Sequence, residues 1–267
     1  MLERRYPRRA PFCDKGILPM ETAVFEPGGY RYIRGPFQYS GGVAAEPGFS
    51  IERARFSTPL AIEDGFSRIK EHLNKKGLPL TSFCACELRS PAPFTEEGFI
   101  NFNRSYVGTL ERWEIFRDDE NPVARSNVCP AVGAPLEPSF QAFSYTVPSA
   151  NCDGSFVIAG SAEAPEGQSN YNERIIRLGD QSADAMREKA LYVLGVMEDR
   201  MAALRKTWDN STATHVYTVY DLHPFLEDEI VIRGAANNGL TWVYARPPVE
   251  GLDFEMDVRG VLTERMI

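Results

Sequence analysis

Residues that build metal sites and disulfide frameworks are scarce in this sequence. Its 267 residues include five cysteines and three histidines, with no CxxC pair and no close pair of histidines. An odd and sparse set of cysteines is not typical of a disulfide scaffold, so a reducing cytoplasm is the simplest compartment. Cys84 and Cys86 would be half of a possible metal site, but small residues alternating on a buried strand face explain them better. We therefore predict no metal site.

Long apolar runs and an excess of positive charge are absent as well. No window approaches the roughly 18 consecutive apolar residues of a membrane span, and the formal net charge is −8. Residues 1–27 hold one basic cluster, Arg4, Arg5, Arg8 and Arg9, but no apolar run of signal-peptide length follows it. Because a phosphate-binding surface needs a clustered excess of Lys and Arg, we expect neither nucleic acid nor a membrane as a partner, and we interpret 1–27 as a basic N-terminal arm.

Apolar periodicity is abundant, and 43% hydrophobic content can fill a core. In the first half, apolar residues recur at helical spacing over 62–73, with a start signal at 58–59 and a stop signal at Gly77. An alternating run over 82–90 predicts a strand, and an apolar stripe over 95–113 predicts a second helix. Two extended runs follow, so the predicted order is helix, strand, helix, strand, strand.

The second half repeats this order. It has a strand over 155–164, a helix from about Ser182, a strand over 214–222, and two extended runs joined by a Pro- and Gly-containing turn over 247–251. The letters YARP (244–247) take the place that VARS has in the first half. A fold of class α+β, built from a duplicated unit, is the prediction.

The predicted units span 28–148 and 149–267, with a linker from Pro148 to Asp153. The segment 30–45 is predicted to be the opening hairpin of the first unit, with its FQYSGG letters corresponding to VIAGSA in the second. A polar segment over 163–173 is predicted to be a loop that covers the site.

Short motifs in both halves resemble one family. They are SGG (40–42), FNRSY (102–106), PVARSNV (122–128), AGS (159–161), VYTVYD (216–221), YARPPV (244–249) and FEMDV (254–258). Their order resembles that of the RidA (YjgF-type) enamine and imine deaminases. A chain with two copies is most similar in kind to the deaminases that act on 2-aminomuconate-type ring-cleavage products, chloro-substituted forms included.

The resemblance implies a fold and an assembly. Each unit would be a chorismate-mutase-like mixed β-sheet backed by two helices, and the chain would form a homo-oligomer, a trimer or a hexamer, with ligand pockets between units. It also implies an activity without cofactors on a small carboxylate substrate.

The resemblance further implies site residues. The carboxylate-binding arginine falls on Arg125 and, in the other half, on Arg246. The remaining residues carried over to the substrate pocket are Asn103, Ser40, Gly41 and the near neighbours Ser126 and Asn127.

The two halves differ at the position where the family has an acidic residue on the final strand. The first half has Gln141 at that position, with Glu137 as a substitute, whereas the second half has Asp257 and Glu255. Neither half therefore carries the full pattern. We hypothesise a composite site in which Arg125 and Asn103 of one half meet Asp257 or Glu255 of another half across an interface.

These residue types suit the hydrolysis of a 2-enamine or 2-imine carboxylate. A guanidinium presents paired donors to a carboxylate and stays charged, while a side-chain carboxyl group can move protons between water and the departing nitrogen. The second carboxylate of a muconate needs a second cation, for which the candidates are Arg246, Arg31 and Arg34.

Several structural alternatives remain open at this point. Arg125 could form a salt bridge that holds its own fold together, and Asp257 and Glu255 could be solvent-exposed. His215 and His223 could be catalytic acids, although packing or surface roles fit them better.

The functional alternatives are a general hydrolase of 2-aminoacrylate-type imines and a non-catalytic module that binds small carboxylates. The second alternative stays open because a fold does not establish catalysis.

Overall fold

The computed structural model of this chain describes residues 20–150, 154–166 and 173–267. The elements in chain order are β1 (Thr22–Phe25), β2 (Tyr30–Ile33), β3 (Gly42–Ala45), β4 (Phe49–Ala61), α1 (Ile62–Lys75), β5 (Phe83–Arg89), α2 (Glu96–Arg112), β6 (Ala124–Pro130), β7 (Ser139–Pro148), β8 (Phe156–Ala162), α3 (Ala183–Ala203), β9 (Ala213–Tyr217), α4 (His223–Phe225) with a π-helical turn over Leu226–Val231, β10 (Leu240–Val243), β11 (Ala245–Arg246), β12 (Glu255–Gly260) and β13 (Thr263–Met266). None of the described helices is long and apolar enough to cross a membrane.

These strands form two mixed sheets with the same central order. One sheet runs β11-β6-β5-β7-β4-β13, and the other runs β1-β2-β3-β8-β12-β9-β10. The pair β5/β6 is parallel, as is the pair β9/β10, while β7 and β12 are antiparallel to their neighbours. The strands β6-β5-β7-β4 thus have the arrangement of β10-β9-β12-β8. The predicted class, α+β with mixed sheets backed by helices, is confirmed.

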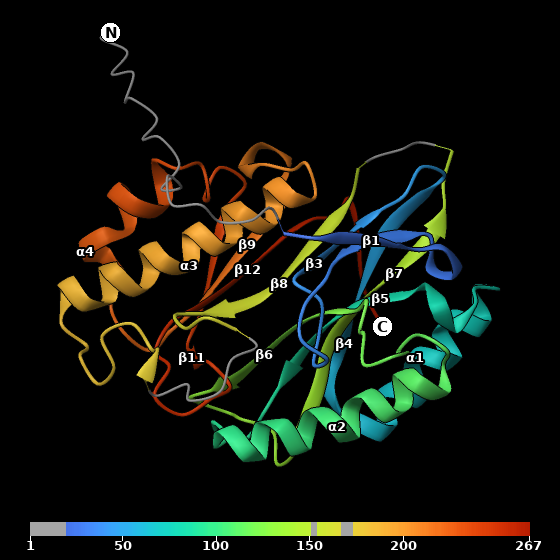
Figure 1. Ribbon diagram of the computed structural model, residues 1–267, viewed down its shortest axis with the longest axis horizontal. Coiled ribbons are helices and arrows are strands. Elements are labelled where there is room, and N and C mark those ends of the chain that lie inside the picture. The colour runs from blue at the N-terminus through green and yellow to red at the C-terminus, as the bar shows by residue number, and fades with distance from the viewer. Residues whose placement is uncertain (1–19, 151–153, 167–172) are drawn as a thin grey trace, which may run out of the picture.

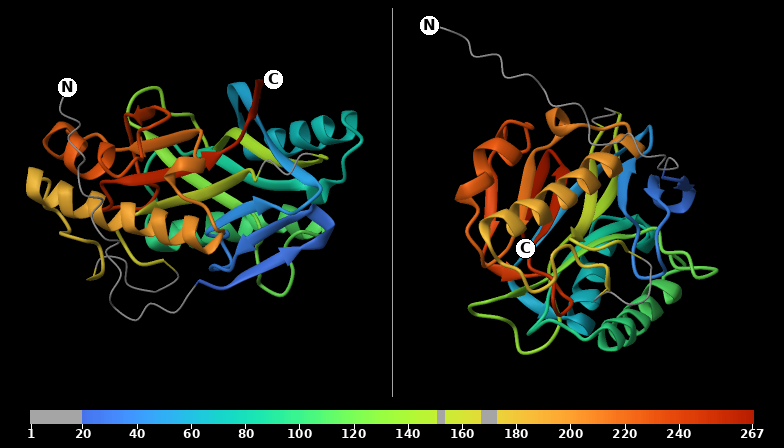
Figure 2. Two further views of the ribbon diagram at one scale, coloured as in Figure 1. Left: turned by 90° about the horizontal axis from the view of Figure 1, so that it is seen from above. Right: turned by 60° about the vertical axis from the view of Figure 1, so that its left-hand side comes forward.

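The two sheets face each other, and the helices cover their outer surfaces (Figures 1 and 2). A core of residues from α1, α2 and the inner strands of the six-stranded sheet lies on one side, and a core built on α3 lies on the other. A third cluster lies between the sheets and takes residues from both, among them Val43 and Ala159 from one sheet and Ala85 and Ala124 from the other. The layers therefore run helix, sheet, sheet, helix.

Both terminal segments cross to the sheet of the other half. The predicted hairpin over 30–45 forms, but β3 pairs with β8 of the second half, Gly42 lying opposite Ile158. At the other end of the chain, β13 pairs in parallel with β4, Thr263 lying opposite Glu52. Placing the hairpin in the first unit was wrong, because periodicity reveals a strand but not its hydrogen-bonding partner. The FQYSGG segment therefore leads into a strand that pairs with β8. The strand of the first half that corresponds to β8 is β4.

The start of the first helix also differs from the prediction. The start signal at 58–59 lies within β4, which continues past a bulge until Leu60 pairs with Phe140, and the helix begins at Ile62. The predicted stop is confirmed, since α1 ends at Lys75 and Gly77 has a φ of +68°, which glycine adopts without strain. A Thr-Pro pair occurs at strand bulges as well as at helix starts. In both places the backbone N–H that proline lacks would not be hydrogen-bonded.

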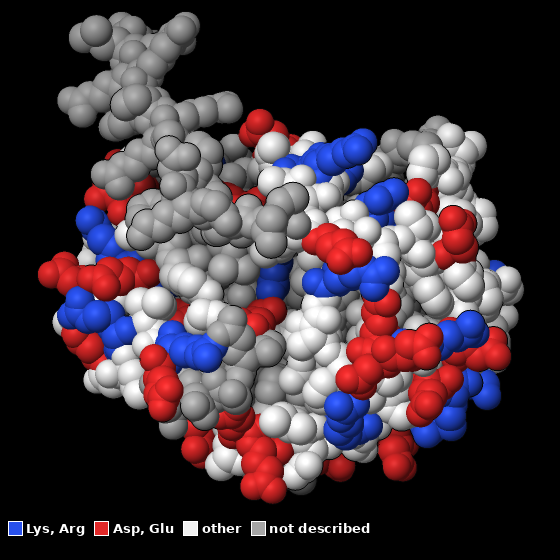
Figure 3. Space-filling model, in the orientation of Figure 1, with Lys and Arg blue, Asp and Glu red and all other residues white. Residues whose placement is uncertain are grey.

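Three predictions fall partly outside the described residues. They concern the basic arm, of which residues 1–19 are not described, the linker, of which 151–153 are not, and the covering loop, of which 167–172 are not. On the face seen in Figure 3, the described Lys and Arg side chains are interspersed with Asp and Glu.

Candidate active site

The two sheets approach most closely where β8 of one faces β6 of the other. A Cβ atom on Gly160 would lie 2.9 Å from Ser126 Cβ and 2.2 Å from Glu255 Oε1, so a larger residue does not fit without displacing its neighbours. Nearby, the Ser40 backbone N–H donates to the Val123 carbonyl oxygen at 2.9 Å, which ties the segment before β3 to the segment before β6. The close approach places side chains from the two halves around one cavity.

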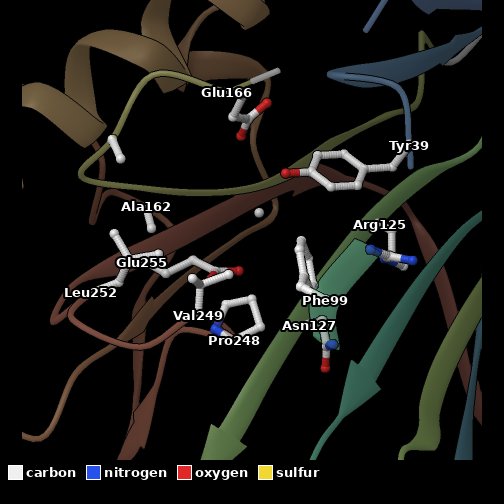
Figure 4. Close-up of a pocket in the computed structure, with 12 residues that line it drawn as sticks. Tyr39, Phe99, Arg125, Asn127, Ala162, Glu166, Pro248, Val249, Leu252 and Glu255 are labelled. Atoms are coloured by element: carbon white, nitrogen blue, oxygen red, sulfur yellow. The ribbon is translucent and has the colours of Figure 1, made fainter. Parts of the chain in front are cut away.

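The space between the atoms of this pocket, open solvent included, is about 420 Å³. Figure 4 shows Arg125 and Asn127 on one side, Glu255 on the other, and Glu166 beyond Tyr39. The lining residues are Tyr39, Phe99, Arg125, Asn127, Gly160, Ala162, Ala164, Glu166, Pro248, Val249, Leu252 and Glu255. Residues 99–127 come from the first half and 160–255 from the second, so both halves of one chain contribute to the pocket.

Arg125, near the start of β6, is the cation of this pocket. Its side chain is buried, and Nη2 donates to Asn103 Oδ1 at 2.5 Å. Four aromatic rings surround the guanidinium carbon at 4.9–5.8 Å, from Tyr106, Tyr39, Phe102 and Phe99. Nη1 is buried and has no hydrogen-bond partner among the described residues.

The predicted alternative, a structural salt bridge at Arg125, is absent from the described part of the chain. A buried guanidinium that lacks an acidic partner is costly to the fold unless a ligand satisfies it. The site is therefore built for an anion.

Two amide groups add further unsatisfied donors. Asn127, two residues after Arg125 on β6, lines the pocket, and its Oδ1 accepts from Ser90 Oγ at 3.0 Å. This bond leaves the Asn127 amide nitrogen buried without a partner among the described residues, and the Asn103 amide nitrogen is in the same condition. Clustered orphan donors mark a place where a ligand or an ordered water supplies acceptors.

Glu255, the first residue of β12, is the acid of the pocket. Its side chain is buried and forms no hydrogen bond or ion pair within the described residues. Burial, reinforced by the negative charges of Asp257 and Glu166, raises the pKa of Glu255 well above its ordinary value. These surroundings thus favour the neutral carboxylic acid, the form that can donate a proton.

Asp257 lies two residues further along β12 on the same face, but its surroundings differ. The Tyr217 hydroxyl donates to Oδ2 at 2.6 Å, and His215 Nδ1 lies 3.1 Å from Oδ1. Burial alone would raise the pKa of Asp257, but the neighbouring His215 outweighs burial and the pKa is lowered. Asp257 does not line the pocket; it lines a smaller cavity between the sheets that also touches Arg125.

The alternative that Asp257 and Glu255 are solvent-exposed is wrong, because only 5% and 3% of their surfaces are exposed. Asp257 belongs to a charge network that joins the sheets. Arg53 binds both carboxylate oxygens of Glu87 at 2.6 and 2.9 Å, and Glu264 accepts from Arg53 at 3.0 Å and from Arg259 at 2.6 Å.

Arg246 is not equivalent to Arg125 in the structure. It lies on β11, which pairs with β6 in the six-stranded sheet, Arg246 opposite Cys129. Its guanidinium donates to the Tyr220 hydroxyl at 3.2 Å and lies 3.7 Å from Asp253. Matching YARP to VARS was therefore wrong, because two similar tetrapeptides occupy different positions in the sheets.

The other predicted residues take supporting positions or lie elsewhere. Ser126 lies beside Gly160 and lines the smaller cavity. Ser40 Oγ bonds to the backbone of Gly42, and Gly41 packs against Ile33 near Arg200, so these two help to shape the junction but do not line the pocket.

The remaining candidate cations and acids lie outside the pocket. Arg31 pairs with Glu46, and Arg34 pairs with Glu120 and Glu21. Gln141 and Glu137 do not line it either. His223 is exposed and bonds to Asp221.

Sequence reasoning missed much of the pocket wall. Its apolar part consists of Phe99, Ala162, Ala164, Pro248, Val249 and Leu252, and its polar part includes Tyr39 and Glu166. The signal for Glu166 was its place in the polar segment predicted to cover the site. Small apolar residues in loops carry no comparable signal, because nothing in their type distinguishes a ligand wall from ordinary packing. The described residues contain no group of three or more His, Cys, Asp or Glu that could hold a metal ion.

Fold and site together define an α+β protein with two facing sheets and a buried anion pocket between its halves. The family model described as 2-aminomuconate deaminase CnbZ matches residues 22–265, and the chain belongs to that family. It is 49% identical, over 249 residues, to the 2-amino-5-chloromuconate deaminase of Comamonas testosteroni, with 92% of this chain and 99% of that protein covered.

Solved structures with similar folds share much less of the sequence. A chorismatase is 12% identical, with 91% of this chain and 80% of that chain covered and a TM-score of 0.43. The product of the E. coli yjgF gene is 18% identical, with 40% of this chain and 80% of that chain covered and a TM-score of 0.28.

Proposed function

We propose that this protein hydrolyses 2-aminomuconate, or a chloro-substituted form, to the 2-oxo acid and ammonia without a cofactor. The observation that carries the proposal is the meeting of two unlike groups in one pocket. A buried guanidinium with an unpaired N–H, Arg125, and a buried neutral acid without a hydrogen-bond partner among the described residues, Glu255, line it from opposite halves. A 2-enamine carboxylate needs both, an anchor for its anion and a donor for its carbon.

Arg125 and Asn127 hold the carboxylate beside the reacting carbon. Nη1 of Arg125 and the amide nitrogen of Asn127 are the free donors, and the bond to Asn103 fixes the guanidinium. An ionised acceptor strengthens such hydrogen bonds roughly twofold over neutral ones. Fixing the substrate in this way supplies much of the rate enhancement, because the reacting atoms no longer have to be brought together.

Glu255 carries the proton. It donates to the enamine carbon, a C–H bond forms, and the nitrogen becomes an iminium. Water then adds to the C=N carbon and returns its proton to the Glu255 carboxylate. In the resulting carbinolamine the hydroxyl proton moves to nitrogen, the C–N bond breaks, and ammonia and the 2-oxo acid leave. One water is consumed and Glu255 ends in its original protonated form.

The apolar wall suits the carbon chain of the substrate. Val249, Leu252 and Phe99 belong to one buried apolar cluster that borders the pocket. A planar diene, with or without chlorine, packs against such a surface more favourably than in water. Among the described lining residues the cation is Arg125, so the distal carboxylate would be held by polar contacts rather than by a second arginine of this set.

An assay with freshly generated 2-aminomuconate tests the proposal. The loss of diene absorbance and the release of ammonia should occur together, at a rate far above that of buffer. Glu255→Gln, which keeps the shape of the side chain and removes the acid, is the matched control. Faster turnover of 2-aminoacrylate would favour a general imine hydrolase. Ligand binding with no ammonia release would show a non-catalytic carboxylate-binding module, and the proposal would then be wrong.

Homo-oligomer formation and a cytoplasmic location remain predictions. The described lining residues of the pocket come from both halves of one chain. Light scattering on the purified protein would give the number of chains.

A further inference from the structure

Glu166 has a free acceptor oxygen at the pocket. Arg200 of α3 donates to Glu166 Oε2 at 2.5 Å and to the Ala159 carbonyl oxygen of β8 at 3.0 Å. The same arginine thus fixes Glu166 and the strand before it. The other carboxylate oxygen, Oε1, is buried and has no partner among the described residues.

The free groups of the pocket are complementary to one arrangement of ligand atoms. Arg125 and Asn127 offer donors without partners, while Glu166 offers an acceptor without one. A 2-amino acid in its enamine form carries an acceptor, the carboxylate, next to a donor, the amino group. Figure 4 shows Glu166 at the top of the pocket, Arg125 at its right and Glu255 at its left, with Tyr39 between Glu166 and Arg125.

We propose that Glu166 binds the amino nitrogen of the substrate, with Oε1 accepting an N–H bond and the carboxylate stabilising the positive charge that develops there. This inference rests on the proposed function. Glu255 has another task in this scheme, because it starts as the neutral acid and directs its proton to the enamine carbon rather than accepting from the nitrogen. An anion held by Arg200 in a buried site stabilises an iminium far more than water would, since it needs no reorganisation. Glu166 itself gains and loses no proton in this scheme.

The variant Glu166→Gln removes the charge and keeps an oxygen for Arg200. We expect kcat on 2-aminomuconate to fall about 100-fold, with KM changed less than about threefold because the carboxylate anchor is intact. The basic limb of the pH profile should also move to lower pH, because the negative charge of Glu166 helps to keep the proton on Glu255. This shift reports the charge of Glu166 near Glu255, while contact with the amino nitrogen is tested by ligand binding.

Binding provides a readout that does not depend on turnover. Calorimetry with 2-aminoadipate and with adipate compares two dicarboxylates that differ by the amino group. Wild type should prefer 2-aminoadipate, and Glu166→Gln should lose about tenfold in affinity for it while its affinity for adipate is unchanged or higher. If Glu166→Gln does not fold, as judged by thermal unfolding, Glu166→Asp, which withdraws the carboxylate by one methylene group, replaces it in the same comparison.

Glu198→Gln is the matched control. Glu198 belongs to α3 and, like Glu166, is paired with an arginine, in this case Arg233 at 3.0 Å. It lies outside the pocket. Its loss should leave kcat and the pH profile unchanged. Wild-type kcat, pH profile and ligand preference in Glu166→Gln would overturn the inference while leaving the deaminase proposal intact. An inactive wild type that still prefers 2-aminoadipate through Glu166 would reject the deaminase activity instead.

Discussion

Glu255 and Asp257 are two acids on one face of one strand, both buried, and their pKa values move in opposite directions. The difference comes from their neighbours. Burial and two like charges raise the pKa of Glu255, whereas Asp257 receives a hydroxyl donor from Tyr217 and lies beside His215. Strand position alone therefore does not assign a chemical role to an acid.

The pocket around Glu255 and the charge network around Asp257 differ in the same way. In the pocket, Arg125, Asn127 and Glu166 each have a buried polar atom without a partner among the described residues, as does Asn103, which bonds to Arg125. In the network between the sheets, the carboxylates of Asp257, Glu87 and Glu264 are all bonded. Unsatisfied buried polar groups are rare in folded proteins, and each needs an explanation such as a ligand, a catalytic role or an ordered water, while paired charges hold the structure together.

The largest expected effect separates the two acids. Glu255→Gln should lower kcat about 10²- to 10⁴-fold, the usual contribution of a general acid, with little loss of stability. Asp257→Asn should lower the free energy of unfolding by about 3 kcal/mol, because it breaks a buried charged pair, and should reduce kcat much less. Steady-state kinetics and urea denaturation of both variants measure this. Equal losses of kcat would mean that both acids act in the pocket.

The second effect separates the two arginines that the sequence motifs had matched. Arg125→Lys should lower kcat/KM about 100-fold, because an ammonium cannot bind Asn103 and a carboxylate in the planar geometry of a guanidinium. Arg246→Lys, at a half-exposed residue outside the pocket, should change kcat/KM less than about threefold. Similar losses in both variants would place Arg246 in the site.

A third effect tests the close approach of the sheets. Gly160→Ala puts a methyl group against Glu255 and Ser126, so we expect about tenfold lower kcat and a loss of stability of about 1–3 kcal/mol. Gly195→Ala, in α3 with open space around the new methyl group, should instead stabilise the protein by roughly 0.5–1 kcal/mol. Activity and thermal unfolding measure both, and a harmless Gly160→Ala would show that the sheets separate easily.

The smallest effect concerns stability and pH. Because the folded-state pKa of Glu255 is raised, the folded protein binds the extra proton, and stability from this group falls as pH rises above the unfolded value of about 4.3. Asp257 has a lowered pKa, so its contribution is present above about pH 3.9 and is lost as pH falls. The stability of Glu255→Gln relative to wild type should therefore rise between pH 5 and 7, by at most about 1.4 kcal/mol per unit. Parallel urea stability curves would contradict this.

Much of the secondary structure was predictable because it depends on local patterns. The apolar stripe over 95–113 became α2, and Ser182 became the residue that caps α3, its hydroxyl accepting from the Ala185 N–H at 3.3 Å. The hairpin over 30–45 was predicted as a hairpin but placed in the wrong sheet. Strand pairing depends on contacts between residues about 100 positions apart, which a single sequence does not encode in its periodicity.

The site was predictable in type and only partly in position. Arg125 and Glu255 came from a resemblance between motifs, and the structure places both in one pocket. Arg246 and Asp257 came from the same reasoning and lie outside it. A motif match reports residue type and order, while the pocket depends on which strand lies opposite which.

The sequence by itself determined the α+β class, the repeated order of elements and the pair of residue types, guanidinium and carboxyl group, that suit a carboxylate substrate. The tertiary structure determines which arginine and which acid lie in the same pocket, namely Arg125 and Glu255. The close approach at Gly160 brings the two halves of one chain around a common cavity, and burial beside like charges raises the pKa of Glu255 there. These properties depend on distance and dielectric environment rather than on residue type, so only the folded chain specifies them.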